Sequence, residues 1–337
     1  MTANVLFPVS IENKMGYIDA QGGVRIPPQF DYAVSFSEGL AVVGNWDPKR
    51  QTDNISGMWK AKYGFINPAG EVVIPPTFDQ ALDFKDGLAP IRVGIRWGYI
   101  DGKGEVIVKP QFDQIAEFSE GLASVRVKKK CQVLDPRGAV VFALDATTIG
   151  ACHEGLMFCE KQRKWSYLDR TGATAFELTC TAAEDFSDGL AAVLKNGRTG
   201  YINRDGQWVI PNRFAQAGQF RAGYARVEFR AEGPYDPTIP QDFGFIDKAG
   251  NRNPPGSFAG AGEFSEGLAA VCLKRGPDEC WAYIDTRGKT RIPALACITA
   301  GEFQDGLAAI GVRDPETGGT HYGYIDQRGK YIWKPQA

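Results

Sequence analysis

Apolar and polar residues alternate along short segments of the chain, which is the pattern of β-strands with one buried face. In residues 122–128, Val125 and Val127 alternate with Arg126 and Lys128. Branched and aromatic residues dominate residues 97–100, and the 3.6-residue period of an amphipathic helix is absent from the chain. The pattern therefore predicts an all-β protein.

Turn signals separate these segments. Each strand of the type found at residues 97–100 is followed by Asp or Asn, two further residues and Gly, as in 101–104. Asp or Asn can accept backbone N–H bonds at the start of a type I turn, and Gly supplies a positive φ at its end. The next strand ends in Ile-Pro-Pro, as at 26–28, and proline belongs at a strand end or sheet edge. A Ser-Glu-Gly turn then leads into the next Leu-Ala strand, so we expect meanders of three or four antiparallel strands.

These elements recur with an underlying period of 34 residues. Tetrapeptides of the type Gly-Tyr-Ile-Asp start at residues 16, 64, 98, 132, 166, 200, 244, 282 and 323. The Gly of Ser-Glu-Gly follows 23 residues later in seven cases and 24 residues later in one, so nearly all length variation lies in the remaining arc. The chain therefore contains nine units in a single domain over residues 1–337, and the units start near residues 6, 40, 88, 122, 156, 190, 224, 268 and 307.

A single meander cannot bury its own aromatic face, so neighbouring units are expected to cover one another. We expect the array to close as a β-propeller with one unit per blade. An open β-solenoid or superhelix is the alternative. Nine units exceed the usual four to eight blades. An incomplete ninth unit that pairs with the strand at Leu6–Ile11 would instead leave eight full blades.

The motifs resemble those of the WG-repeat family, whose units read roughly KWGYID..G..VIPP.FD.A..FSEGLA.V. Residues 95–123 are the best copy, and the resemblance covers essentially the whole chain. In the fourth and fifth units, Gln132 and Ser166 stand in place of the Gly, and Ile-Pro-Pro is missing. The family is widespread in bacteria, and the resemblance implies a fold type more than an activity.

Composition and charge exclude several classes of function. The 38 Lys and Arg residues nearly balance the 40 Asp and Glu residues, so no net field favours nucleic acid or an anionic membrane. The first unit begins at Leu6, which leaves too little chain for a signal peptide, and no apolar run approaches the ~18 residues of a membrane-spanning helix. We therefore expect a cytoplasmic protein that binds neither nucleic acid nor membrane.

Candidate catalytic groups are few. The repeated carboxylates, such as Asp101 and Glu120, occur once per unit and are interpreted as turn caps. His153 interrupts the repeat beside Cys152, but Cys152 occupies a core Phe position, where a buried thiol is unreactive. We interpret four cysteines as core residues: Cys131, Cys152, Cys159 and Cys180. The cysteine spacing fits no metal site and no nucleophile or nucleotide motif occurs, so we expect no enzymatic activity, metal or cofactor.

The loops of variable length are the main candidates for a binding face, because a repeat scaffold fixes such loops while leaving their sequence free. They cover residues 44–61, 230–241, 274–280 and 312–321, and in a closed array they would share one sector. Trp, Tyr and Arg are typical of interface hot spots. The candidate binding residues are Trp46, Lys49, Arg50, Trp59, Arg230, Tyr235, Asp236, Asp278, Glu279 and His321. The alternative is that Trp46 and Trp59 only fix a long loop to the scaffold.

The first functional hypothesis is a non-enzymatic interaction module that binds a protein or peptide through these loops. Deletion of residues 44–61 should then abolish partner capture without changing thermal unfolding. The second is a small-ligand-binding or enzymatic propeller whose site lies at the axis or at unit junctions and uses non-repeated residues such as His153 or His321. The third is a dedicated partner-binding protein of a bacterial conflict or secretion system.

Overall fold

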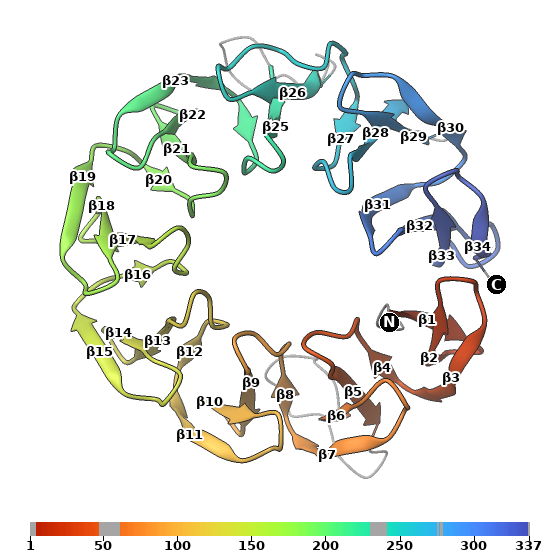
Figure 1. Ribbon diagram of the computed structural model, residues 1–337, viewed down its shortest axis with the longest axis horizontal. Coiled ribbons are helices and arrows are strands. Elements are labelled where there is room, and N and C mark those ends of the chain that lie inside the picture. Colours follow the sequence, from red (N-terminus) through yellow and green to blue (C-terminus); the bar gives the residue numbers. More distant parts are fainter. Residues whose placement is uncertain (1–4, 47–60, 230–240, 275, 277–278, 336–337) are drawn as a thin grey trace. The chain divides into compact units, whose positions relative to one another are not determined.

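The computed structural model describes residues 5–46, 61–229, 241–274, 276 and 279–335. These residues form β-strands, and none of the described segments is helical. The strands group into nine small antiparallel sheets, each built from strands that follow one another in the chain (Figure 1). The fold is that of a nine-bladed β-propeller, which confirms the class predicted from the repeats. Each sheet is called a blade and is numbered along the chain.

The chain divides into two compact units, residues 1–162 with 169–173 and residues 163–168 with 174–337. The strands of the first unit are β1 (Leu6–Ile11), β2 (Lys14–Asp19) and β3 (Val24–Phe30) in blade 1, β4 (Tyr32–Ala33), β5 (Ala41–Trp46), β6 (Ala61–Ile66) and β7 (Val72–Phe78) in blade 2, β8 (Gln80–Ala81), β9 (Leu88–Val93), β10 (Arg96–Asp101) and β11 (Val106–Phe112) in blade 3, β12 (Gln114–Ile115), β13 (Ala123–Val127), β14 (Lys130–Leu134) and β15 (Val140–Leu144) in blade 4, and β16 (Thr148–Ile149) and β17 (Leu156–Lys161) in blade 5.

The second unit contains the remaining strands. They are β18 (Lys164–Asp169) and β19 (Thr174–Leu178) in blade 5, β20 (Ala182–Ala183), β21 (Ala191–Lys195), β22 (Arg198–Ile202) and β23 (Trp208–Phe214) in blade 6, β24 (Gln216–Ala217), β25 (Tyr224–Glu228) and β26 (Phe243–Asp247) in blade 7, β27 (Gly260–Ala261), β28 (Leu268–Lys274), β29 (Cys280–Asp285) and β30 (Thr290–Leu295) in blade 8, and β31 (Thr299–Gln304), β32 (Leu307–Arg313), β33 (Thr320–Asp326) and β34 (Tyr331–Trp333) in blade 9.

The predicted Asp-x-x-Gly turns are present in all nine repeats. In each, the side-chain oxygen of the Asp or Asn accepts the backbone N–H groups two and four residues later, at 2.8–3.1 Å. The Gly has a positive φ every time, as at Gly104 with a φ of 83°. These carboxylates therefore cap their own turns, as predicted.

The acidic residue of Ser-Glu-Gly has a different role from the predicted one. Glu38 and Gly39 have φ values of 51° and 82°, which is the geometry of a two-residue hairpin of type I′. The Glu38 carboxylate accepts the N–H of Gly87 in blade 3 at 2.9 Å. Glu120 does the same for Gly155 at 2.9 Å. The interpretation of Glu120 as a cap of its own turn is therefore wrong, because its side chain reaches the equivalent turn of the next blade.

Neighbouring blades share their hydrophobic cores. The Tyr99 hydroxyl of β10 donates to the Ala116 carbonyl just after β12 at 2.5 Å, and its ring packs on Phe118 with centroids 4.8 Å apart. The same cluster buries Phe112 of blade 3 with Val125 of blade 4. Because each core contains residues from two consecutive blades, the prediction that units cover one another is confirmed.

The Gly before the Tyr lies directly against the proline-containing strand of its own blade. At Gly98 an added Cβ would meet the Val108 carbonyl oxygen and would lie 2.7 Å from the Pro110 nitrogen. The β10–β11 register shifts at this point, between Trp97 and Tyr99. In blade 4, where Gln132 replaces the Gly, the pairing of residues 131–133 has no such shift. Blades 4 and 5, where Gln132 and Ser166 replace the Gly, therefore pair without a bulge at this position.

Three details differ from the sequence-based expectation. The strand at Leu6–Ile11 pairs with β2 of its own blade, and blade 9 completes four strands with β34, so the eight-blade alternative is wrong. The short first strand of most blades comes from the segment that the repeat pattern assigned to a connector. Cys180 is half-buried, whereas Cys131, Cys152 and Cys159 are buried as predicted.

Candidate functional site

Trp46 is the one candidate of the first long loop that lies within the described residues. It is the last residue of β5, and 48% of its surface is exposed. Its backbone N–H donates to the Asp31 carboxylate at 2.6 Å. Seven other candidates lie outside the described residues, so their placement stays a prediction: Lys49, Arg50, Trp59, Arg230, Tyr235, Asp236 and Asp278.

Glu279 and His321 contact residues of their own hairpins. The Glu279 carboxylate accepts the indole N–H of Trp281 at 3.1 Å. His321 Nε2 lies 3.0 Å from Asp314 Oδ2, across the hairpin between β32 and β33. Hydrogen bonds from Thr317 and His321 hold the pKa of the Asp314 carboxyl below its usual value. These contacts shape the two loops, and a binding role for either residue stays a prediction.

The hairpins between the second and third strands carry exposed apolar side chains that were not among the candidates. Exposed fractions are 49% for Val93 and 80% for Ile95, on the β9–β10 hairpin of the first unit. In the second unit, Leu273 is 50% exposed on β28 and Tyr322 is 60% exposed on β33. At the turn position of Ile95, other repeats have Asn13, Lys129 and Gly197, whereas Tyr322 lies at the position that Trp97 has in blade 3. This contrast between repeats is the signal that could have identified them.

We call Trp46, Val93 and Ile95 the hairpin-tip surface of the first unit. A hydrogen bond that recurs between consecutive blades holds the backbone of this surface in place. Asp79, which follows β7, accepts the N–H of Gly94 at the tip of the next blade at 2.8 Å. The same carboxylate pairs with Lys62 of its own blade at 2.7 Å. Asp31 links Lys14 to the Trp46 backbone in the same way, so adjacent tips are tied together.

Cys152 is not arranged as a nucleophile. Its side chain is 1% exposed, and its sulfur lies 3.5 Å from both Glu120 Oε2 and Arg170 Nη1. Burial, reinforced by the Glu120 charge, raises the pKa of the thiol to about 11. The reactive thiolate is therefore scarce at neutral pH. His153 pairs with Leu156 across the two-residue turn formed by Glu154 and Gly155.

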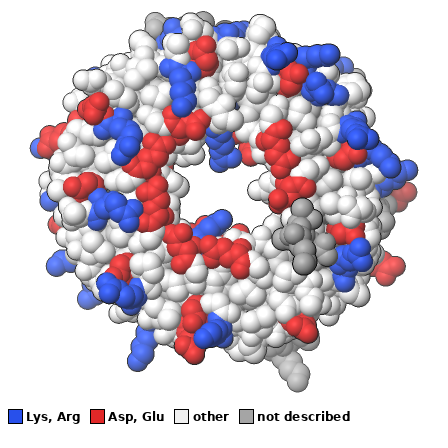
Figure 2. All heavy atoms as spheres, viewed as in Figure 1, with Lys and Arg blue, Asp and Glu red and all other residues white. Residues whose placement is uncertain are grey.

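Acidic side chains gather along the blade edges that carry the short first strands (Figure 2). In the first unit, burial raises the pKa of Asp83, and burial with the nearby Asp83 charge raises that of Glu117. In the second unit, Glu263 lies 3.5 Å from Arg226, and burial raises the pKa of Glu263 as well. Holding these carboxylates ionised therefore costs folding free energy.

We expect the double variant Asp83→Asn, Glu117→Gln to unfold at a higher temperature than the wild type at pH 7. A carboxyl whose pKa is raised on folding destabilises the protein increasingly as pH rises through its unfolded and then its folded pKa. The gain should therefore shrink toward pH 3, where the wild-type groups are mostly protonated in both states. Thermal unfolding at the two pH values checks this. Asp86→Ala, which removes the acceptor of the Gly121 N–H, should lower the unfolding temperature at pH 7.

Among the described residues, no helix has the length and apolarity required to cross a membrane. The same residues bring no three His, Cys, Asp or Glu side chains into a group that could hold a metal ion.

Solved structures match this chain at low sequence identity. A eukaryotic initiation factor superposes with a TM-score of 0.69 at 10% identity, covering 98% of this chain and 95% of that one. AztD from Citrobacter koseri gives a TM-score of 0.42 at 11% identity, covering 97% and 93%. The tricorn protease gives 0.29 at 13% identity, covering 98% and 44%. At such identities the first of these supports the fold alone, and no curated protein matches the chain.

The WG containing repeat model matches residues 15–45, 63–94, 97–131, 165–198 and 200–230. Each match covers parts of two consecutive blades, as residues 97–131 do from β10 of blade 3 to β13 of blade 4, and includes one Asp-x-x-Gly turn. Residues 132–164, where the Gly is replaced and Ile-Pro-Pro is missing, lie outside the matched segments. The chain is therefore a WG-repeat protein, with five of its nine repeats matched by the family model.

Proposed function

We propose that the protein is a non-enzymatic interaction module and that it binds a protein or peptide through its hairpin tips. The observation that supports this most is the 80% exposure of Ile95, beside Val93 at 49% and with Trp46 at 48% on the preceding blade. Leaving an Ile or Trp side chain in water forgoes about 1.5–3 kcal/mol of burial free energy. A partner that covers these side chains would recover it.

The attachment of the tips favours binding. A surface that is already ordered loses little conformational entropy when a partner docks. The Asp79 and Asp31 contacts hold the Gly94 and Trp46 backbones against neighbouring blades, so these two positions are fixed before binding. Trp is also among the residue types that contribute most at protein interfaces. The unit therefore offers a pre-formed apolar surface with an aromatic residue in it.

The expected location and partners agree with this proposal. All seven cysteines are free thiols, as is usual for proteins of a reducing compartment such as the cytoplasm. The nearly balanced charge, with 38 basic and 40 acidic residues, gives no support for a nucleic acid partner. We propose a cytoplasmic protein partner.

Ile95→Asp should reduce capture of the partner at least tenfold, because it places a charge in an apolar interface. Val106→Asp is the matched control, since Val106 is 53% exposed on β11 of the same blade but lies outside the hairpin tip. Capture from a lysate of the native host, quantified by mass spectrometry, compares the two variants with the wild type. Both variants should unfold at the wild-type temperature. Equal losses in the two variants, or none in Ile95→Asp, would contradict the proposal.

A further inference from the structure

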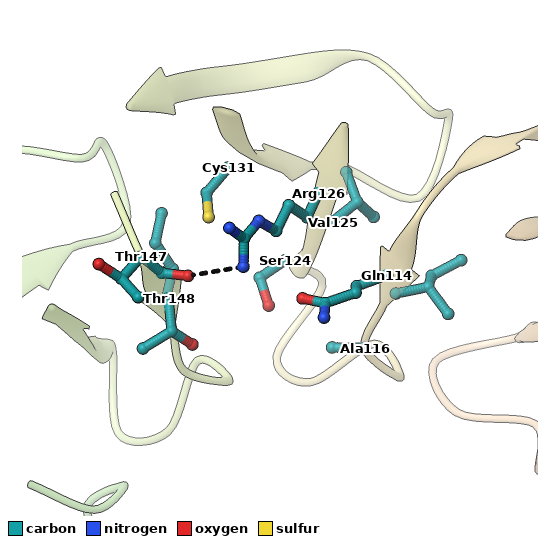
Figure 3. Close-up of a pocket in the computed structure, with 10 residues that line it drawn as sticks. Gln114, Ala116, Ser124, Val125, Arg126, Cys131, Thr147 and Thr148 are labelled. Carbon is teal, nitrogen blue, oxygen red and sulfur yellow. Dashed lines mark hydrogen bonds between the residues drawn. The ribbon is translucent and has the colours of Figure 1, made fainter. Parts of the chain in front are cut away.

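A pocket of about 230 Å³ lies between blade 4 and the start of blade 5, within the first unit (Figure 3). Its lining combines the Arg126 guanidinium with the polar side chains of Gln114, Ser124 and Thr148. Apolar atoms of Val125 and other residues form the rest of the wall. A site with one cation, several hydrogen-bonding groups and an apolar wall suits a small amphiphilic anion.

The origin of this pocket can be read from one row of cross-strand neighbours. In blade 3 the row consists of Gln80, Arg92, Trp97 and Phe112. In blade 4 it consists of Gln114, Arg126, Cys131 and Leu144. The polar half of the row is unchanged, while both aromatic residues are replaced by smaller ones. Blade 4 therefore keeps the cation and loses the ring that covers it.

Trp97 shows what the missing ring does. The guanidinium carbon of Arg92 lies 5.7 Å from the centroid of the Trp97 ring, a cation–π contact. Trp97 also packs against the core shared by blades 3 and 4. Cys131 is 4% exposed and lines the pocket, so its short side chain leaves open the space that a Trp would fill.

The Arg126 guanidinium uses two of its N–H donors in hydrogen bonds to backbone carbonyls. It reaches from β13 to the next blade, where Nη1 donates to the Thr147 carbonyl at 3.2 Å (Figure 3). Its Nε donates to the Lys128 carbonyl at 3.2 Å. These two bonds fix the guanidinium plane and use two of its five N–H groups. The fork that remains matches the two oxygens of a carboxylate.

We propose that this pocket binds a small organic carboxylate, with Arg126 pairing with the carboxylate and the space left by Cys131 accepting the apolar part. The volume of about 230 Å³ corresponds to about eight water molecules at ~30 Å³ each, so it suits acids of about six to eight non-hydrogen atoms. This site is independent of the hairpin-tip surface. The ligand would occupy the space that the Trp97 side chain fills in blade 3.

Ligand-observed NMR titration with hexanoate tests the proposal, with hexanamide as the uncharged probe of the same shape. We expect saturable binding of hexanoate with a Kd of about 1 mM, as is reasonable for so few atoms. Hexanamide should bind at least tenfold more weakly. Saturable binding of inorganic phosphate in place of hexanoate would overturn the assignment to a carboxylate, and so would equal binding of the two probes.

Three variants of the full chain make the test specific. Arg126→Gln should raise the Kd for hexanoate at least tenfold, whereas Arg92→Gln, the equivalent position under Trp97, should leave it within twofold. Cys131→Trp restores the residue found at this row in blade 3 and should abolish binding while keeping the wild-type unfolding temperature. Wild-type affinity in Arg126→Gln, or in a folded Cys131→Trp protein, would overturn the proposal. If Cys131→Trp fails to fold, the comparison of Arg126→Gln with Arg92→Gln decides it.

Discussion

Gly98→Ala is expected to lower the free energy of unfolding by about 3 kcal/mol, at the upper end of the cost of overpacking. An added methyl group would meet the Val108 carbonyl oxygen and lie 2.7 Å from the Pro110 nitrogen and 2.9 Å from the Lys109 carbonyl carbon. These are backbone atoms, so they cannot move aside as a flexible side chain would. The β10–β11 bulge would have to rearrange. Urea denaturation with linear extrapolation measures the change.

Gly102→Ala is the matched control for this prediction. Gly102 lies in the turn that follows the same strand, and the nearest atom to an added Cβ is Leu40 Cδ1 at 3.9 Å. This substitution should change the free energy of unfolding by less than about 0.5 kcal/mol, as at other uncrowded surface positions. Similar losses for Gly98→Ala and Gly102→Ala would show that close approach of the two backbones is not the reason for the Gly in this motif.

Phe220→Ala is the second substitution with a large expected effect, about 3–5 kcal/mol of lost unfolding free energy. The Phe220 ring is 0% exposed and packs edge-on against Tyr201, with centroids 4.8 Å apart. It contributes to the core that blades 6 and 7 share. Removing the ring would leave a cavity and also weaken the packing around the Tyr201 hydroxyl, which donates to the Gly218 carbonyl at 2.7 Å.

Trp208→Ala provides the comparison for Phe220. Trp208 is a larger aromatic residue of blade 6, which shares this core with blade 7, but it is 37% exposed on β23. Its truncation should cost less than half as much as that of Phe220, measured by urea denaturation. A greater loss for Trp208→Ala would contradict the assignment of the core to the interface between blades.

Local features of the fold could be predicted from the sequence because each is encoded within a few residues. The turn at Asp101 needs only its own carboxylate and the positive φ of Gly104, which is 83°. The buried tyrosines and phenylalanines recur at fixed positions, so their shared burial follows from the repeat. The core position of Cys131 was recognised as well, and the residue was interpreted only as a structural thiol.

Contacts between blades could not be predicted in the same way. Glu38 accepts a hydrogen bond from Gly87, 49 residues later, and no local pattern specifies that partner. The two-residue strand β12 is too short to show an alternation, so its segment was assigned to a connector. The pocket beside Arg126 depends on which row of blade 4 faces blade 5, which requires the strand register.

The sequence predicts the candidate binding residues in the long loops, since length variation is visible in a sequence. Exposure of Ile95 at 80% depends instead on how the β9–β10 hairpin projects from its blade, and that hairpin has the common length. The sequence therefore predicts binding residues in the loops of variable length, whereas the exposed apolar tip at Val93 and Ile95 lies on a hairpin of the common length.

We propose above that the hairpin-tip surface of Trp46, Val93 and Ile95 contacts a protein partner. Site-specific photo-crosslinking tests it most directly, with a photoreactive phenylalanine analogue placed at position 95 or, as the control, at position 106 of the full chain. After irradiation in the native host, we expect one discrete crosslinked protein from position 95 that is absent from position 106. The same products from both positions, or none from position 95, would contradict it.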